Sequence, residues 1–352
     1  MEKRKHDYAL DLLRFICALA VVMGHYEDQF DVHFSTLDFT TENFYYWIVN
    51  ISGLFFIISG YLSYNSIDKI RNGLRFEKYY SGKLIRIVPV AAISRFFYGL
   101  MTYVTWRGKD FSVWKVLATA FLVQAGGPFT EMFVNSHLWY LSVLLLCYAL
   151  FFIAIRLSRR FEINWRYACW FMVILGASAF NVTAWNNLPF IGIAASFGYM
   201  SFFTGVLLAS VLENRGPNRI AVLMSLFILV SFSLLLIFRY EVMRYGMTYL
   251  MLFIYYPAII VLIKSDVAQK LLNHKAFGFL GKITLGVYIW HMEFNILLSI
   301  ADSVLHLGIN FATRWAELVV ILMNVAIGTG SFYLLEKPIH KALSRKLAER
   351  GI

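Results

Sequence analysis

Residues 7–26 read DYALDLLRFICALAVVMGHY, an apolar stretch interrupted by only a few polar side chains. A helix needs roughly 20 mostly apolar residues to cross the hydrocarbon core of a bilayer, so this stretch is long enough to span a membrane. Further stretches of near-spanning length follow along the chain. We therefore expect an all-α, polytopic membrane bundle of ten transmembrane helices, at residues 7–26, 44–66, 84–106, 137–156, 167–185, 195–213, 220–238, 246–264, 284–302 and 316–335.

The composition agrees with a membrane protein. Of the 352 residues, 59% are hydrophobic and 15% are charged, whereas soluble domains are about 45–50% apolar and about 25% charged. This excludes an ordinary soluble enzyme, a nucleic-acid-binding protein and a disordered chain. Because no internal repeat or long linker divides the sequence, we predict one integral membrane domain over residues 1–352. The cysteines, Cys17, Cys147 and Cys169, lie in apolar stretches without C-x-x-C spacing and should be buried thiols.

One apolar stretch, at residues 111–124, is too short to span comfortably and carries Lys115. We expect a short re-entrant or interfacial helix there. The distribution of basic residues supports this choice, since cytoplasmic loops are enriched in Lys and Arg. With ten spans and a cytoplasmic N-terminus, 24 of the 32 Lys and Arg fall inside, 6 fall outside, and Arg14 and Arg95 lie within spans. The sequence therefore predicts a multi-pass protein of the cytoplasmic (inner) membrane with both termini cytoplasmic.

The first span carries ionisable residues, which are costly inside a membrane and usually functional. Arg14 and His25 are eleven residues apart, which places them on one helix face about 16 Å apart along the axis. Asp11 lies about one turn before Arg14. The alternatives are that Arg14 snorkels to the inner interface and that His25 caps the outer end of the helix. Their shared face instead favours a site with a cation near the inner end and an imidazole further out.

A second cationic group lies at the inner end of the third span. Lys83 and Arg86 are three residues apart and so share a helix face. Plain positive-inside topology is one interpretation. The other is a phosphate site, because Arg can bind phosphate oxygens bidentately and Lys supplies a point charge. No Walker A motif or dinucleotide-binding glycine motif is present, so the anion would be held between helices.

Other polar and aromatic side chains within or beside the spans are candidates to line a substrate cavity. Ser59 could instead be a small packing residue, the aromatic residues at the start of the fourth span could form an interfacial belt, and a buried histidine could be merely hydrogen-bonded. No metal-ligand spacing such as H-E-x-x-H and no G-x-S-x-G motif occurs, so chemistry here would depend on a histidine acting as a general base. These candidates are Ser59, His137, Trp139, Tyr288 and His291.

The sequence also resembles a known family. The stretch DLLRFICALAVVMGH resembles the opening signature of the acyltransferase 3 family, in which Arg is followed by ten residues and then His. Further motifs follow in the family's order, although Gly82 stands where a second basic residue is common in the third-helix motif. The matching stretches are residues 11–25, 54–61, 76–89, 280–291 and 335–338.

The resemblance implies a ten-helix enzyme that transfers an acyl group, usually acetyl, from cytoplasmic acyl-CoA to a surface carbohydrate. His25 would be the catalytic histidine, assisted by Arg14, and Arg14, Lys83 and Arg86 would bind the donor. Tyr288 and His291 would line the same cavity. Asp11, Ser59, His137 and Trp139 are further candidates to bind the substrate or line the cavity. No metal and no tightly bound cofactor is implied; acyl-CoA would be a donor substrate.

Two departures from the family limit this transfer. Residues 137–144, HLWYLSVL, lack the acidic residues that some members carry there, and the chain lacks the extracytoplasmic hydrolase-like domain of longer members. The acceptor therefore stays open, and any second acyl-handling step would need a partner such as glycan-synthesis or export machinery. Two other functions stay open: a glycan exporter or transporter, and the same acyl transfer onto a lipid or small molecule. The net charge of +11 is explained by topology and an anionic donor rather than by nucleic acid.

Overall fold

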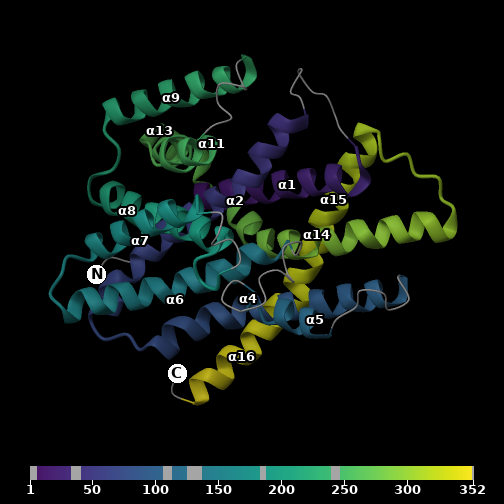
Figure 1. Cartoon of the computed structure of the whole chain (residues 1–352), viewed down its shortest axis with the longest axis horizontal. Helices are drawn as coiled ribbons and strands as arrows, with labels where there is room; N and C mark the ends of the chain where they lie inside the picture. Colours follow the sequence, from purple (N-terminus) through teal and green to yellow (C-terminus); the bar gives the residue numbers. More distant parts are fainter. Residues whose placement is uncertain are drawn as a thin grey trace.

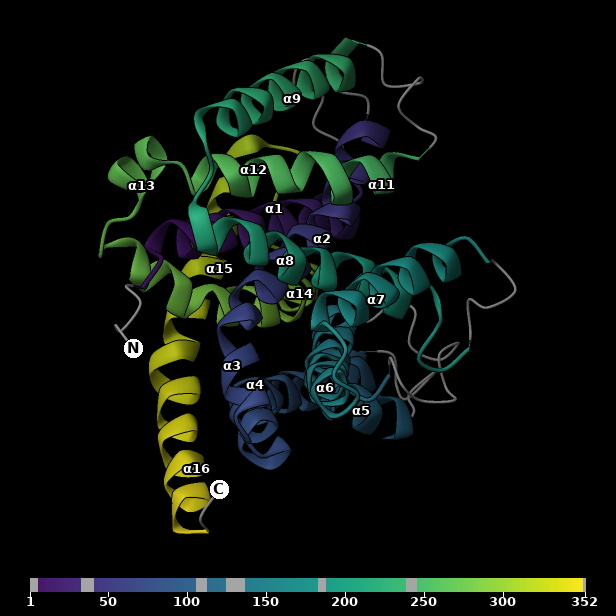
Figure 2. The same cartoon turned by 90° about the vertical axis from the view of Figure 1, so that its left-hand side faces the viewer.

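The computed structural model describes residues 6–32, 41–105, 113–124, 137–182, 188–238 and 246–350. Within these ranges the chain is helical and contains no strand. The helices pack as a bundle with α1, α2, α8 and α14 near its centre (Figures 1 and 2). The main helices are α1 (Tyr8–Phe30), α2 (Thr41–Ser63), α4 (Phe76–Thr105), α6 (Trp139–Arg160), α7 (Trp165–Phe180), α8 (Ile193–Arg215), α9 (Arg219–Phe238), α14 (Phe277–Leu305) and α15 (Arg314–Ser331).

Shorter elements connect or extend these helices. The eighth apolar segment is a composite of α11, a π-helical turn η4 and α12, and a second π-helical turn, η5, links α15 to the C-terminal helix. The bounds are η1 (Tyr64–Ser66), α3 (Ile67–Arg71), α5 (Val113–Ala120), α11 (Met247–Leu250), η4 (Met251–Tyr255), α12 (Tyr256–Ile263), α13 (Asp266–Leu272), η5 (Phe332–Glu336) and α16 (Lys337–Glu349).

Helices occur at all ten predicted apolar segments, but ten membrane spans are not confirmed. Among the described residues, six helices are long and apolar enough to cross a membrane, or seven if the bent pair Met247–Ile263 and Asp266–Leu272 forms one span. The helix α7 has only 16 residues, about 24 Å of helix against a hydrocarbon core of about 30 Å. The six or seven long apolar helices nevertheless show that the chain is a multi-pass membrane protein.

The segment predicted as a short non-spanning helix is α5. Its eight residues extend for about 12 Å, less than half the thickness of the hydrocarbon core. The prediction of a short helix in this segment is confirmed by α5, although residues 111 and 112 lie outside the described ranges. Trp114 of α5 is 77% exposed, which suits an interfacial position, but the re-entrant and interfacial alternatives both stay open.

Small residues bring the central helices into close contact. Helices α1 and α14 run side by side in the same direction. Gly278 lies against Tyr8, and one turn further along both helices Gly281 lies against Asp11.

The three predicted buried thiols are confirmed as free and buried. Large apolar side chains also cover outer surfaces; on α9, Phe227 is 72% exposed, as expected where a helix faces lipid.

Contacts between helix ends agree with the predicted alternation of spans. Lys264, at the end of the eighth segment, contacts Asp7 before α1 at 3.0 Å and Glu213 at the end of α8 at 2.9 Å. The positive-inside assignment had placed these three ends on one side. At the other end of α1, the Tyr26 hydroxyl donates to the Phe311 carbonyl at 2.7 Å, beside the loop between α14 and α15. Ends assigned to the same side thus lie together.

Candidate functional site

A cavity of about 80 Å³ lies between α1, α2, α4, α6 and α14. Since one water molecule needs roughly 10–15 Å³ of such space, the cavity has room for several waters or a small chemical group. Its lining combines cationic, aromatic, hydroxyl and aliphatic side chains. The lining residues are Arg14, Phe55, Ser59, Lys83, Arg86, Ile87, Tyr140, Leu141, Leu144, Tyr148, Thr284, Leu285 and Tyr288.

The cations of this cavity have no carboxylate in direct contact. Within the described parts of the chain, Arg14, Lys83 and Arg86 form no ion pair. The Lys83 ammonium instead lies 4.5 Å from the centroid of the Tyr148 ring. Glu336 acts on Arg86 through its charge without reaching ion-pair distance. Three cations that repel one another are stabilised by a bound anion, so this cavity is suited to an anionic ligand.

Aromatic rings and hydroxyls form the rest of the wall. Ser59 Oγ lies 3.4 Å from the Tyr140 hydroxyl, and the rings of Tyr140 and Tyr288 are 5.6 Å apart. Phe55 contacts both tyrosine rings. This wall could accommodate an uncharged group attached to an anion that the cations bind.

Three histidines from separate elements gather beside this wall. The half-buried His25 of α1 stacks on His291 of α14, with ring centroids 5.1 Å apart and an interplanar angle of 27°. His137, just before α6, meets His291 edge-on at 4.9 Å. The Tyr288 hydroxyl donates to the His137 carbonyl at 2.5 Å. Tyr288 therefore joins the cavity to the histidine cluster.

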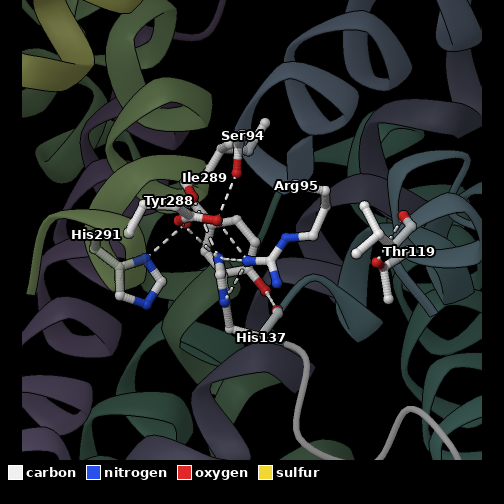
Figure 3. A network of polar contacts seen from close by, with 9 residues as sticks. Ser94, Arg95, Thr119, His137, Tyr288, Ile289 and His291 are labelled. Carbon is white, nitrogen blue, oxygen red and sulfur yellow. Dashed lines mark hydrogen bonds and ion pairs between the residues drawn. The ribbon is translucent and has the colours of Figure 1, made fainter. Parts of the chain in front are cut away.

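A buried ion pair between Arg95 and Glu293 contacts His137; Figure 3 shows Arg95 beside His137, with His291 on the other side. Arg95 of α4 contacts Glu293 Oε1 at 2.5 Å, and the Ser94 hydroxyl donates to the same oxygen at 2.6 Å. The Arg95 guanidinium also lies 3.0 Å from His137 Nδ1. His137 Nε2 lies 3.2 Å from the Ile289 carbonyl oxygen. The pair thus links α4, α14 and the segment before α6.

The structure brings most of the predicted site residues into two adjoining groups. The first group lines the cavity and consists of Arg14, Ser59, Lys83, Arg86 and Tyr288. The second group is the histidine cluster of His25, His137 and His291.

Of the predicted cavity residues, only Ser59 and Tyr288 line the described cavity. His137 and His291 lie in the adjoining histidine cluster, whereas Asp11 and Trp139 belong to neither group. Asp11 Oδ2 is 2.5 Å from His6 Nε2. The Trp139 ring packs 6.2 Å from Phe56, while its neighbour Tyr140 reaches the cavity. Consecutive residues of a helix point about 100° apart, so the aromatic pair divides between two environments.

The sequence interpretation missed Ser94, Glu293 and the aromatic residues Tyr140 and Tyr148. A signal existed for the ion pair, because Arg95 and Glu293 both fell within predicted spans, and charges at that depth usually pair with one another. Which two charges meet depends on helix packing, which one sequence does not supply. Tyr140 belongs to the aromatic residues at the start of the fourth span, which also fit an interfacial belt, and Tyr148 carried no sequence signal that separated it from ordinary apolar packing.

The family model described as an acyltransferase domain, of the acyltransferase 3 type, matches residues 7–333. The chain belongs to this family. No curated protein and no solved structure matches the chain. The matched region contains Arg14, His25, Lys83 and Arg86, whereas the motif at residues 335–338 lies just beyond it. Together with the long apolar helices, family membership supports a membrane acyltransferase.

Proposed function

We propose that this protein is a membrane O-acyltransferase that uses cytoplasmic acyl-CoA, most simply acetyl-CoA. The acceptor is a hydroxyl of a surface polysaccharide or of its lipid-linked precursor. In this proposal ten spans place both termini in the cytoplasm and the protein lies in the cytoplasmic (inner) membrane. The cavity with Arg14, Lys83 and Arg86 then opens toward the cytoplasmic pool of the donor.

The cluster of three cations, which no carboxylate of the described residues contacts, carries this proposal. Coenzyme A bears phosphates, which Arg binds bidentately and Lys binds as a point charge. A site with three neighbouring cations gains electrostatic stabilisation when such an anion enters. The cavity itself holds only a small group, so the bulk of the donor would lie toward its mouth.

The same helix that supplies Arg14 supplies the base. His25 lies about 16 Å further along α1, a separation comparable with an extended pantetheine arm. In the proposed reaction, the His25 imidazole removes the proton from the acceptor hydroxyl, whose oxygen attacks the thioester carbonyl carbon. The carbon–sulfur bond then breaks, and the coenzyme A thiolate leaves and takes up the proton from His25. A neutral histidine is suited to both transfers.

Mass spectrometry of surface glycans tests this function directly. Cells lacking the gene should be complemented with the wild-type chain, with His25→Ala and with His306→Ala, an exposed histidine beyond the end of α14. We expect the wild-type chain and His306→Ala to restore one acyl unit per modified sugar. His25→Ala should restore none, although it should be present in the membrane at a comparable level.

The outcomes separate the competing functions. Normal acylation by His25→Ala would contradict the general-base assignment. Loss of the whole polymer, instead of its acyl group, in cells lacking the gene would indicate an exporter. An unchanged glycan accompanied by an acylated lipid or small molecule would retain the reaction and change the acceptor.

A further inference from the structure

We propose that the buried Arg95–Glu293 ion pair positions the catalytic histidine His25, acting through His137 and His291. This inference rests on the proposed function, because it assigns roles to residues around the proposed base. Arg95 and Glu293 would act as positioning residues: they contact other side chains of the site and need not touch the substrate.

A continuous series of contacts connects the pair to His25. Glu293 Oε2 lies 3.5 Å from His137 Nε2, and the Arg95 guanidinium lies 3.0 Å from His137 Nδ1. The His137 ring meets His291 edge-on, and His291 stacks on His25. Moving the ion pair would therefore move the ring against which His291 rests, and His291 forms one side of the space that His25 occupies.

A backbone hydrogen bond fixes the His291 ring. His291 Nδ1 lies 2.6 Å from the carbonyl oxygen of Tyr288. Because a carbonyl oxygen can only accept, Nδ1 must carry the proton, and Nε2 of the neutral ring then carries the lone pair. His291 Nε2 is buried and has no hydrogen-bond partner among the described residues. The cluster thus presents an oriented imidazole nitrogen next to His25.

The ion pair is better explained by positioning than by stability. Side chains of Arg95 and Glu293 are only 5% and 1% exposed, so both charges have lost their hydration. Replacing a buried ion pair with apolar residues of similar volume is often neutral or stabilising, whereas removing one partner is strongly destabilising. An apolar pair of similar volume can keep two helices packed, but it could not fix the His137 ring by charge and hydrogen bonds.

This contrast defines the principal experiment, the double variant Arg95→Met/Glu293→Leu. Folding is followed by the thermal midpoint of the purified protein in detergent. Acetyl-CoA is the donor, polysaccharide extracted from cells lacking the gene is the acceptor, and released thiol reports turnover. We expect a thermal midpoint close to that of the wild-type chain, an unchanged KM for acetyl-CoA and a kcat lowered at least tenfold. Wild-type kcat in the folded double variant would overturn the proposal.

A conservative variant and a matched control complete the design. Arg95→Lys keeps the charge but offers a single ammonium group where the guanidinium contacts both Glu293 and His137. We expect a several-fold lower kcat with an unchanged KM for acetyl-CoA. Should the double variant not fold, this measurement decides alone: an unchanged kcat would overturn the proposal. Glu317→Gln removes a buried carboxylate paired with Arg314 on α15 and should leave kcat unchanged.

The proposed function and this inference fail in different ways. Absence of thiol release by the wild-type chain, with every acceptor fraction, would count against the acyltransferase function itself. An active wild-type chain whose folded variants are equally active would count only against the positioning role of the ion pair.

Discussion

Arg86 is the cavity cation for which the structure offers the clearest test. It lines the cavity with Arg14 and Lys83, and its side chain remains accessible to solvent. Glu336 and Asp11 act on Arg86 through their charges, and within the described residues neither forms an ion pair with it. A guanidinium in this state can bind a phosphate without first breaking a strong contact within the protein.

We therefore predict that Arg86→Gln weakens binding of acetyl-CoA. Hydrogen bonds to charged groups contribute about 1.5–3 kcal/mol, so the Kd should rise about ten- to a hundredfold. Isothermal titration calorimetry on the detergent-solubilised protein would measure it. Arg71→Gln is the control, because Arg71 is exposed on α3 and lies outside the cavity lining. Equal affinities of Arg86→Gln and the wild-type chain would refute a donor-binding role for Arg86.

Residue spacing predicted some groupings and not others. Arg14 and His25 share a face because eleven residues complete three helical turns, and Lys83 and Arg86 share one because they are three apart. Such groupings within one helix follow from sequence alone. The meeting of Arg14 with Lys83, and of Arg95 with Glu293, joins different helices and depends on crossing geometry that spacing does not determine.

At the scale of elements, α2 and α8 are held in close contact by reciprocal glycines. A Cβ atom at Gly60 of α2 would overlap the backbone carbonyl of Phe202, and a Cβ atom at Gly205 of α8 would overlap the backbone carbonyl of Ile57. Neither carbonyl can move without displacing its helix. The sequence had offered small-residue packing as one reading of the segment around Ser59, and Gly60 fits it.

Gly205→Ala should therefore destabilise the bundle. The added methyl group forces α2 and α8 apart, and overpacking of this kind costs about 1–3 kcal/mol. A lower thermal midpoint in detergent would show it. Gly330→Ala is the matched control, because no atom lies within 4 Å of a Cβ atom built at Gly330, and alanine favours a helix over glycine by about 1 kcal/mol. A Gly205→Ala midpoint at or above that of the wild-type chain would argue against close helix contact.

The N-terminal end of α1 is tied to two other helices through Lys264. Burial lowers the pKa of Lys264, but its contacts with Glu213 and Asp7 outweigh burial, and the net pKa is raised. Because the folded-state pKa exceeds the unfolded value, this stabilisation is complete below the ordinary lysine pKa of about 10.4. It is lost as the pH rises through the raised value.

Thermal midpoints measured from neutral to strongly alkaline pH should reveal this loss. Lys264→Met should lower the midpoint near neutral pH and flatten its alkaline decline. Lys270→Met, at an exposed position of α13, should leave the profile of the wild-type chain unchanged. Identical alkaline profiles for Lys264→Met and the wild-type chain would show that the Lys264 contacts do not stabilise the fold.

At the scale of the whole molecule, hydropathy predicted where helices form better than how many cross the membrane. Each of the ten apolar segments corresponds to a helix or a composite of helices, because burial and lipid exposure both favour apolar side chains. The bounds were less predictable: α14 extends over Phe277–Leu305, well beyond the predicted 284–302. The added ends are mostly apolar but include Gly278, Gly281 and Lys282, which weaken the hydropathy signal although the helix continues through them.

The orientation of the bundle yields the last prediction. Asn72, after α3, and Asn310, between α14 and α15, are exposed and were assigned to the cytoplasmic and outer sides. The native cysteines are at most 1% exposed, so they should contribute little background to thiol labelling. In intact cells, a membrane-impermeant maleimide should label Asn310→Cys, and it should label Asn72→Cys only after permeabilisation. The reverse pattern would invert the bundle, and the cation cavity would then no longer face the cytoplasmic source of acyl-CoA.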